Sequence, residues 1–148
     1  MKLMLGGLML ALLSTTAPRC VGAQLPPAMI AQLKKDAAAG DAKAQYHLGL
    51  MYARGKGVPE NDVEAVKWYR LAAAQGLDMA QYALGFMYAG GEGVPEDYIQ
   101  AYKWYNLAAA AGDTIAVKSK NRVAEKMTKE QIAEAQRLST AFKPTKTP

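Results

Sequence analysis

Side chains that could carry out catalysis or hold a metal ion are few in this sequence. The single histidine is His47, and the single cysteine, Cys20, lies near the N-terminus. After residue 23, the only serines are Ser119 and Ser139. Nucleophilic catalysis needs a nucleophile with an adjacent base, and a zinc site needs several cysteine or histidine ligands. We therefore predict no catalytic residues, no metal site, no cofactor and no enzymatic activity.

Carboxylates gather at two places, and paired carboxylates can act as a general acid and base. The two groups are Glu60, Asp62 and Glu64, and Glu92, Glu96 and Asp97. Both groups fall in loops and first helical turns, where the helix dipole favours negative charge. This structural role explains them, and a paired-carboxylate hydrolase is the alternative.

The elements that position these residues come from a stretch that occurs twice. Residues 41–76 align with residues 77–112 without a gap, at a spacing of 36 residues and with 22 identical positions. A fixed period between about 20 and 50 residues is typical of stacked repeats, whose single units cannot bury their own apolar faces. We therefore predict an all-α solenoid of helix-turn-helix repeats, with helical caps at both ends.

Each repeat is predicted to hold two antiparallel helices. Helix A covers about 42–54 and 78–90, where apolar side chains recur at helical spacing. Gly49 and Gly85 interrupt it at the same position, and each costs about 1 kcal/mol relative to alanine. Such a repeated cost indicates that a bulky tyrosine or tryptophan approaches the helix closely there.

Helix B follows a glycine-containing turn and begins with a capping box in both repeats. The boxes pair Asn61 with Glu64 and Asp97 with Gln100, and the helices run to Gln75 and Ala111. Three side chains per repeat are expected to face the core: Trp68, Leu71 and Ala72, with their counterparts Trp104, Leu107 and Ala108. Gly40, Gly76 and Gly112 share the period and are expected to end helices with positive φ.

The flanking segments are predicted to close the stack. Residues 24–40 hold an N-terminal capping helix, and residues 113–142 hold a degenerate third repeat with C-terminal capping helices. The last helix begins with a capping box at Thr128 and Gln131. Its apolar side consists of Ile132, Ala135, Leu138 and Phe142. Residues 143–148 are predicted to be a disordered tail.

The first 23 residues have the pattern of a secretory signal peptide. Lys2 supplies positive charge, residues 3–17 are apolar, and Val21-Gly22-Ala23 offers small residues before a cut at Gln24. We expect export to the periplasm or the medium, with no membrane span after cleavage. An uncleaved N-terminal anchor is the alternative. The mature chain then contains no cysteine, so its stability must come from packing alone.

The formal charge of +5 is unevenly distributed. Residues 41–112 contain 6 basic and 8 acidic residues, whereas residues 113–148 contain 8 basic and 4 acidic residues. A solvated helix face explains this asymmetry. Binding of anionic envelope polymers or lipid by the basic C-terminal helices is the alternative.

The repeated motif resembles the Sel-one-like repeat (SLR), an α/α family related to tetratricopeptide repeats. It reads Ala-Gln-Tyr-x-Leu-Gly-x-Met-Tyr-x-x-Gly-x-Gly-Val-Pro, followed by Ala-x-x-Trp-Tyr-x-x-Ala-Ala-x-x-Gly, and it covers residues 41–112. The resemblance implies a right-handed superhelix of helix pairs. It also implies an adaptor in an envelope or host-interaction process. Cysteine-rich SLR proteins suggest β-lactam or cell-wall chemistry instead, which the absence of cysteine in the mature chain disfavours.

Stacked helix pairs form an extended groove, lined mainly by helix A, that can hold a peptide or a partner protein. Positions of helix A that differ between the copies are therefore our candidate partner-binding residues. They are Lys43, His47, Leu50 and Arg54 in the first copy, and Met79, Ala83 and Phe86 in the second. The repeated tyrosines and tryptophans are interpreted as packing residues, with a carbohydrate platform as the alternative. We expect a monomer that binds protein or peptide and no nucleic acid.

Overall fold

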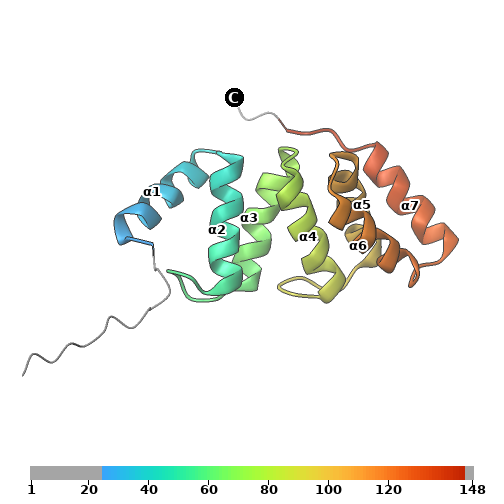
Figure 1. Ribbon diagram of the computed structural model, residues 1–148, viewed down its shortest axis with the longest axis horizontal. Coiled ribbons are helices and arrows are strands. Elements are labelled where there is room, and N and C mark those ends of the chain that lie inside the picture. Colours follow the sequence, from blue (N-terminus) through green and yellow to red (C-terminus); the bar gives the residue numbers. More distant parts are fainter. Residues whose placement is uncertain (1–24, 146–148) are drawn as a thin grey trace, which may run out of the picture.

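The computed structural model describes residues 25–145, so the predicted signal peptide at 1–23 and residues 146–148 lie outside the described part. Within it the chain forms seven α-helices and no strand, stacked along one axis in sequence order (Figure 1). The helices are α1 (Pro27–Ala38), α2 (Ala42–Arg54), α3 (Asp62–Ala74), α4 (Asp78–Gly90), α5 (Tyr98–Ala110), α6 (Thr114–Ala124) and α7 (Lys129–Thr140). The predicted all-α stack of helix pairs is confirmed.

Local sequence sets the ends of these helices. Helices α2 and α4 have the bounds predicted for helix A, and each is followed by a glycine in the left-handed conformation. Gly40, Gly76 and Gly112 follow α1, α3 and α5 with φ of 99°, 90° and 104°, as their spacing predicted. None of the described helices combines the length and the apolar character needed to cross a membrane.

The caps of α3 and α5 differ from the predicted capping boxes in one bond. Asn61 Oδ1 accepts from the backbone N–H of Glu64, and Asp97 Oδ1 accepts from that of Gln100, as expected. The reciprocal bond is absent from these two caps, because the N–H groups of Asn61 and Asp97 donate to the carbonyls of Tyr52 and Tyr88 instead. The full capping box forms at Thr128 and Gln131 of α7.

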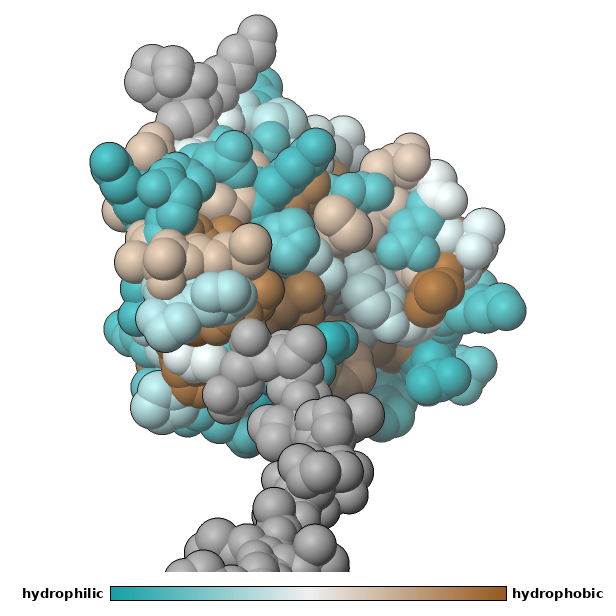
Figure 2. Space-filling model, turned by 60° about the vertical axis from the view of Figure 1, so that its left-hand side comes forward, coloured by the Kyte–Doolittle hydropathy of each residue, from teal (hydrophilic) through white to brown (hydrophobic). Residues whose placement is uncertain are grey.

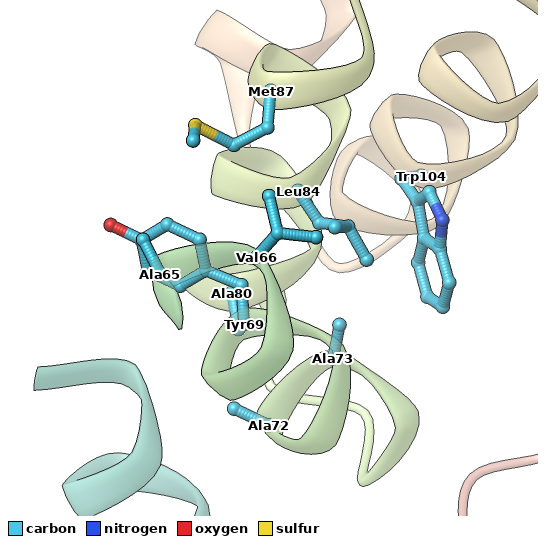
Figure 3. Close-up of a cluster of buried hydrophobic side chains, with 9 residues drawn as sticks. All are labelled: Ala65, Val66, Tyr69, Ala72, Ala73, Ala80, Leu84, Met87 and Trp104. Carbon is cyan, nitrogen blue, oxygen red and sulfur yellow. The ribbon is translucent and has the colours of Figure 1, made fainter. Parts of the chain in front are cut away.

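The main core lies between α3, α4 and α5 (Figure 3). Its members are Ala65, Val66, Tyr69, Ala72, Ala73, Ala80, Leu84, Met87 and Trp104. Small alanines let the helices approach closely, while Leu48 of α2 and Leu84 of α4 are the largest fully buried side chains. Burying a leucine in this way stabilises the fold by roughly 1.5–3 kcal/mol.

The two helical glycines contact tyrosine rings, as their repeated position predicted. A Cβ atom placed on Gly49 would lie 2.7 Å from Cδ1 and Cε1 of Tyr69. A Cβ atom on Gly85 would lie 2.8 and 2.9 Å from the same atoms of Tyr105. Since both rings are only 3% exposed, each glycine provides the space into which the partner helix packs its tyrosine.

The predicted buried face of helix B was wrong in part. Leu71 is 50% exposed and Trp68 is only half-buried, whereas Tyr69 lies in the core. The true buried stripe follows the alanines and Tyr69, which turns Leu71 outward. Trp104 is buried because Phe142 packs edge-on against it at 5.6 Å between ring centroids. Trp68 instead packs at the edge of a small cluster beside α1 and α2.

After α7 the chain turns back toward the first repeat (Figure 1). The backbone N–H of Thr145 donates to the carbonyl of Ala74 at 2.8 Å, and the Thr145 hydroxyl donates to the same oxygen at 3.1 Å. Pro144 lies against Gly76, where an added Cβ atom would be 3.4 Å away. Residues 143–145, predicted to belong to a disordered tail, are thus fixed against the end of α3. We call residues 142–145 the C-terminal strap.

Candidate functional site

Two neighbouring clefts lie along the face formed by α2, α4 and α6. The first, of about 360 Å³, lies between α2 and α4, and the second, of about 250 Å³, lies between α4 and α6. Tyr82 and Phe86 of α4 line both clefts, so the clefts lie side by side on the two sides of these residues. We call the pair of clefts the helix A groove.

The two clefts are copies of each other at the 36-residue period. Eight residues that line the first cleft have their counterparts, 36 positions later, in the lining of the second. The pairs are Tyr46 and Tyr82, Leu50 and Phe86, Ala53 and Ala89, Arg54 and Gly90, Tyr69 and Tyr105, Ala83 and Ser119, Phe86 and Arg122, and Met87 and Val123. The sequence repeat therefore produces a repeated surface as well as a repeated core.

A pair of tyrosine rings, tilted against each other, lines each cleft. The rings of Tyr46 and Tyr69 lie 5.9 Å apart, and those of Tyr82 and Tyr105 lie 5.5 Å apart. Burial raises the pKa of Tyr69, and it raises the pKa of Tyr105 to about 12. Both phenols are therefore neutral at physiological pH.

The two clefts differ in charge. The first contains one basic and one acidic side chain, Arg54 and Glu92. The second contains Arg122 and Lys126, and its lining contains no carboxylate. The ammonium of Lys126 lies 5.3 Å from the centre of the Tyr98 ring and 3.4 Å from its hydroxyl oxygen. The groove thus becomes basic toward α6.

Four of the seven sequence-predicted residues line this groove: Leu50, Arg54, Ala83 and Phe86. The other three, Lys43, His47 and Met79, are exposed on α2 and α4 and belong to the lining of neither cleft. His47 Nδ1 lies 2.7 Å from the carbonyl of Lys43, a contact within its own helix.

Sequence reasoning missed the contribution of α6. Ser119 and Arg122 of α6 and Lys126 just after it line the second cleft, whereas the sequence predicts a degenerate repeat and a cap for this segment. They stand 36 positions after Ala83, Phe86 and Gly90. Extending the 36-residue period into α6 would therefore have predicted them as groove residues. Tyr46 and Tyr82 were likewise interpreted as packing residues, and their rings also form part of the groove surface.

The surface of the stack exposes several large apolar side chains between hydrophilic ones, as the face in Figure 2 illustrates. Phe86 of α4 is 50% exposed within the groove, and Leu71 of α3 is 50% exposed outside it. Among residues 25–145, no three histidine, cysteine, aspartate or glutamate side chains gather closely enough to hold a metal ion. The chemistry this groove offers is apolar contact, hydrogen bonding by phenols, charge of both signs in the first cleft and positive charge in the second.

Comparison with known proteins bears on this arrangement. The Sel1 repeat family matches residues 42–77 and 78–113. A solved protective antigen of uropathogenic Escherichia coli strains, described as displaying an SLR fold, is 36% identical with a TM-score of 0.74 over 76% of this chain and 24% of its own. A solved Sel1 repeat protein from Oxalobacter formigenes is 40% identical with a TM-score of 0.63, over 64% of this chain and 27% of its own.

The chain therefore spans about a quarter of the length of each of these two solved proteins. A search among curated proteins finds no match.

Proposed function

Because this chain is a Sel1 repeat protein with the SLR fold, we propose that it is an adaptor whose helix A groove binds a protein or peptide. The observation that supports this role most strongly is the repetition of one cleft at the 36-residue period. Equivalent clefts in a row suit an extended partner, because successive parts of that partner meet equivalent surfaces. Concave surfaces of this kind are what repeat proteins use for binding.

The lining of the groove supports the same role. Its centre is Phe86, a half-exposed aromatic side chain shared by both clefts. Aromatic and arginine side chains dominate the binding energy of protein interfaces, and Arg54 and Arg122 flank Phe86 in the two clefts. The groove requires no catalytic group for such binding.

The proposed setting is outside the cytoplasm, in an envelope or host-interaction process. The signal-peptide pattern at residues 1–23 supports export, and the similar E. coli protein is described as a protective antigen. Sequencing the N-terminus of the protein recovered from the periplasm or medium should give Gln24 as the first residue. A chain that still begins at residue 1 would contradict cleavage.

Site-specific photo-crosslinking tests the groove directly. A photoreactive amino acid replaces Phe86 in one variant and Leu71 in another, since both side chains are 50% exposed and apolar. After irradiation in cells, a partner should crosslink from position 86 and not from position 71. The captured protein should then bind the purified adaptor, and Phe86→Ala should weaken that binding.

Equal crosslinking from both positions would contradict the proposed groove. The enzymatic alternative has its own assay: turnover of a chromogenic β-lactam or of muropeptides by the purified protein would overturn the adaptor role.

A further inference from the structure

The two sides of the second cleft differ in charge, although they hold equivalent positions of the 36-residue repeat. Along α4 the groove side chains carry no charge, with Phe86 at the centre and Gly90 after it. The equivalent positions 36 residues later are Arg122 of α6 and Lys126 in the turn that follows α6. An uncharged aromatic surface therefore lies directly beside a purely basic one.

The basic pair has no acidic partner in the cleft. The lining of the second cleft contains two cations and no carboxylate, and the two ion pairs of the described residues, Glu64 with Lys67 and Glu134 with Arg137, involve neither cation. Lys126 contacts only the face and hydroxyl of Tyr98 among its described interactions. Such a site is electrostatically complementary to an anionic group.

Size and surroundings favour a side chain as that group. The second cleft has a volume of about 250 Å³, below the roughly 300–1,000 Å³ of ordinary small-molecule pockets. It shares Phe86 with the first cleft, where Glu92 adds negative charge. A nucleic-acid backbone presents regularly spaced phosphates along its length, which this mixed and partly acidic groove does not match.

Resting on the proposed function, we infer that the groove selects an acidic peptide segment. An apolar or aromatic side chain of the peptide packs on Phe86, and an aspartate or glutamate binds Arg122 and Lys126. Phe86, Arg122 and Lys126 line the same cleft, and an extended chain advances about 3.3 Å per residue. The two anchor residues are therefore only a few positions apart in the peptide.

Selection from a library tests this specificity without a known partner. The purified protein is used to select binders from random twelve-residue peptides displayed on phage, and enriched peptides are synthesised for fluorescence anisotropy. Enriched sequences should carry aspartate or glutamate within a few positions of an apolar or aromatic residue. Raising the salt concentration from 0.1 M to 0.5 M should weaken their binding, because salt screens exposed charges.

Two matched double variants locate the acidic contact. Arg122→Ala with Lys126→Ala removes both cations of the cleft, and Lys34→Ala with Lys35→Ala makes the same charge change at exposed positions of α1, outside it. The first should bind the enriched peptides about tenfold or more weakly, as expected for lost charge-assisted hydrogen bonds. The second should bind within about twofold of wild type. Equal binding by both double variants would overturn the inference.

Other outcomes separate the inference from the function on which it rests. Enriched peptides that require Phe86 but carry no acidic residue would defeat the acidic selectivity and leave the groove as a peptide site. Enrichment of no peptide, or of peptides indifferent to Phe86→Ser, would count against the groove itself. Binding of a single-stranded oligonucleotide with the same dependence on Arg122 and Lys126 would also overturn the inference.

Discussion

Replacing Gly85 by alanine tests how tightly the two helices of a repeat are packed. The new Cβ atom would lie 2.8 and 2.9 Å from two ring carbons of Tyr105 and 3.2 Å from the carbonyl oxygen of Ala101. Ordinary carbon contacts occur at about 3.5–4.0 Å, so the methyl group overlaps the ring. Tyr105 is 3% exposed, which leaves the ring little room to move away.

Two opposing effects decide the size of the change. Alanine improves helix propensity by about 1 kcal/mol over glycine. Overpacking a filled core costs about 1–3 kcal/mol, and contact with both a rigid ring and a backbone carbonyl places this site near the upper end. We therefore expect Gly85→Ala to lower the free energy of unfolding by about 2 kcal/mol.

Urea unfolding followed by circular dichroism at 222 nm measures this change. Gly90→Ala is the matched control in the same helix, because its Cβ atom would meet only the flexible Glu92 side chain, with its carboxylate oxygen at 3.3 Å. This control should be neutral or stabilise the fold by up to about 1 kcal/mol. In a Tyr105→Leu background the penalty of Gly85→Ala should disappear, as a double-mutant cycle would show. A Gly85→Ala protein as stable as the Gly90→Ala control would refute the packing argument.

Three further predictions concern the tryptophans, the buried phenols and the groove surface. Trp104→Ala should lower the free energy of unfolding by about 3–5 kcal/mol, and Trp68→Ala by clearly less, because only Trp104 is covered by Phe142. Equal losses of stability in chemical denaturation would contradict this difference. Burial raises the pKa of Tyr105 to about 12, from an ordinary value near 10, so the unfolded chain loses this proton at lower pH than the folded chain. The free energy of unfolding should therefore fall between about pH 10 and pH 12. Tyr105→Phe should reduce this decline. Arg54→Ala and His47→Ala remove exposed side chains and should change the free energy of unfolding by less than about 0.5 kcal/mol, which thermal melting can check.

Much of the fold could be predicted because the repeat marks its own boundaries. The bounds of α2 and α4 follow from apolar spacing and from glycines that end each helix. The contact between Gly85 and Tyr105 follows from a repeated cost that only close packing explains. Each of these features depends on residues within one repeat, so the same residues occur in both copies at the 36-residue spacing.

The buried face of helix B could not be predicted in the same way. Its core stripe is made largely of alanines, whose short side chains give a weak apolar signal beside Trp68 and Leu71. Burial of Trp104 depends on Phe142, which comes after α7 and has no counterpart for Trp68. Equivalence in sequence therefore did not imply equivalence in burial.

The groove was predictable in place and only partly in composition. Its position on helix A follows from the architecture of stacked helix pairs, and Leu50, Arg54, Ala83 and Phe86 line it. The basic side of the groove was not predicted, because α6 shares few identical residues with the equivalent helices α2 and α4. Its groove positions keep the period while its residue types change, so an identity count does not detect them.

The C-terminal strap alters how the stack should come apart. In a linear array of repeats each unit contacts its neighbours, so the ends can unravel independently of the middle. Here Thr145 hydrogen-bonds to Ala74, 71 residues earlier, and Phe142 covers Trp104 on the way. Release of α7 therefore also uncovers the second repeat and frees the last turn of the first. This link between distant units favours a single cooperative unfolding transition over fraying from the C-terminal end.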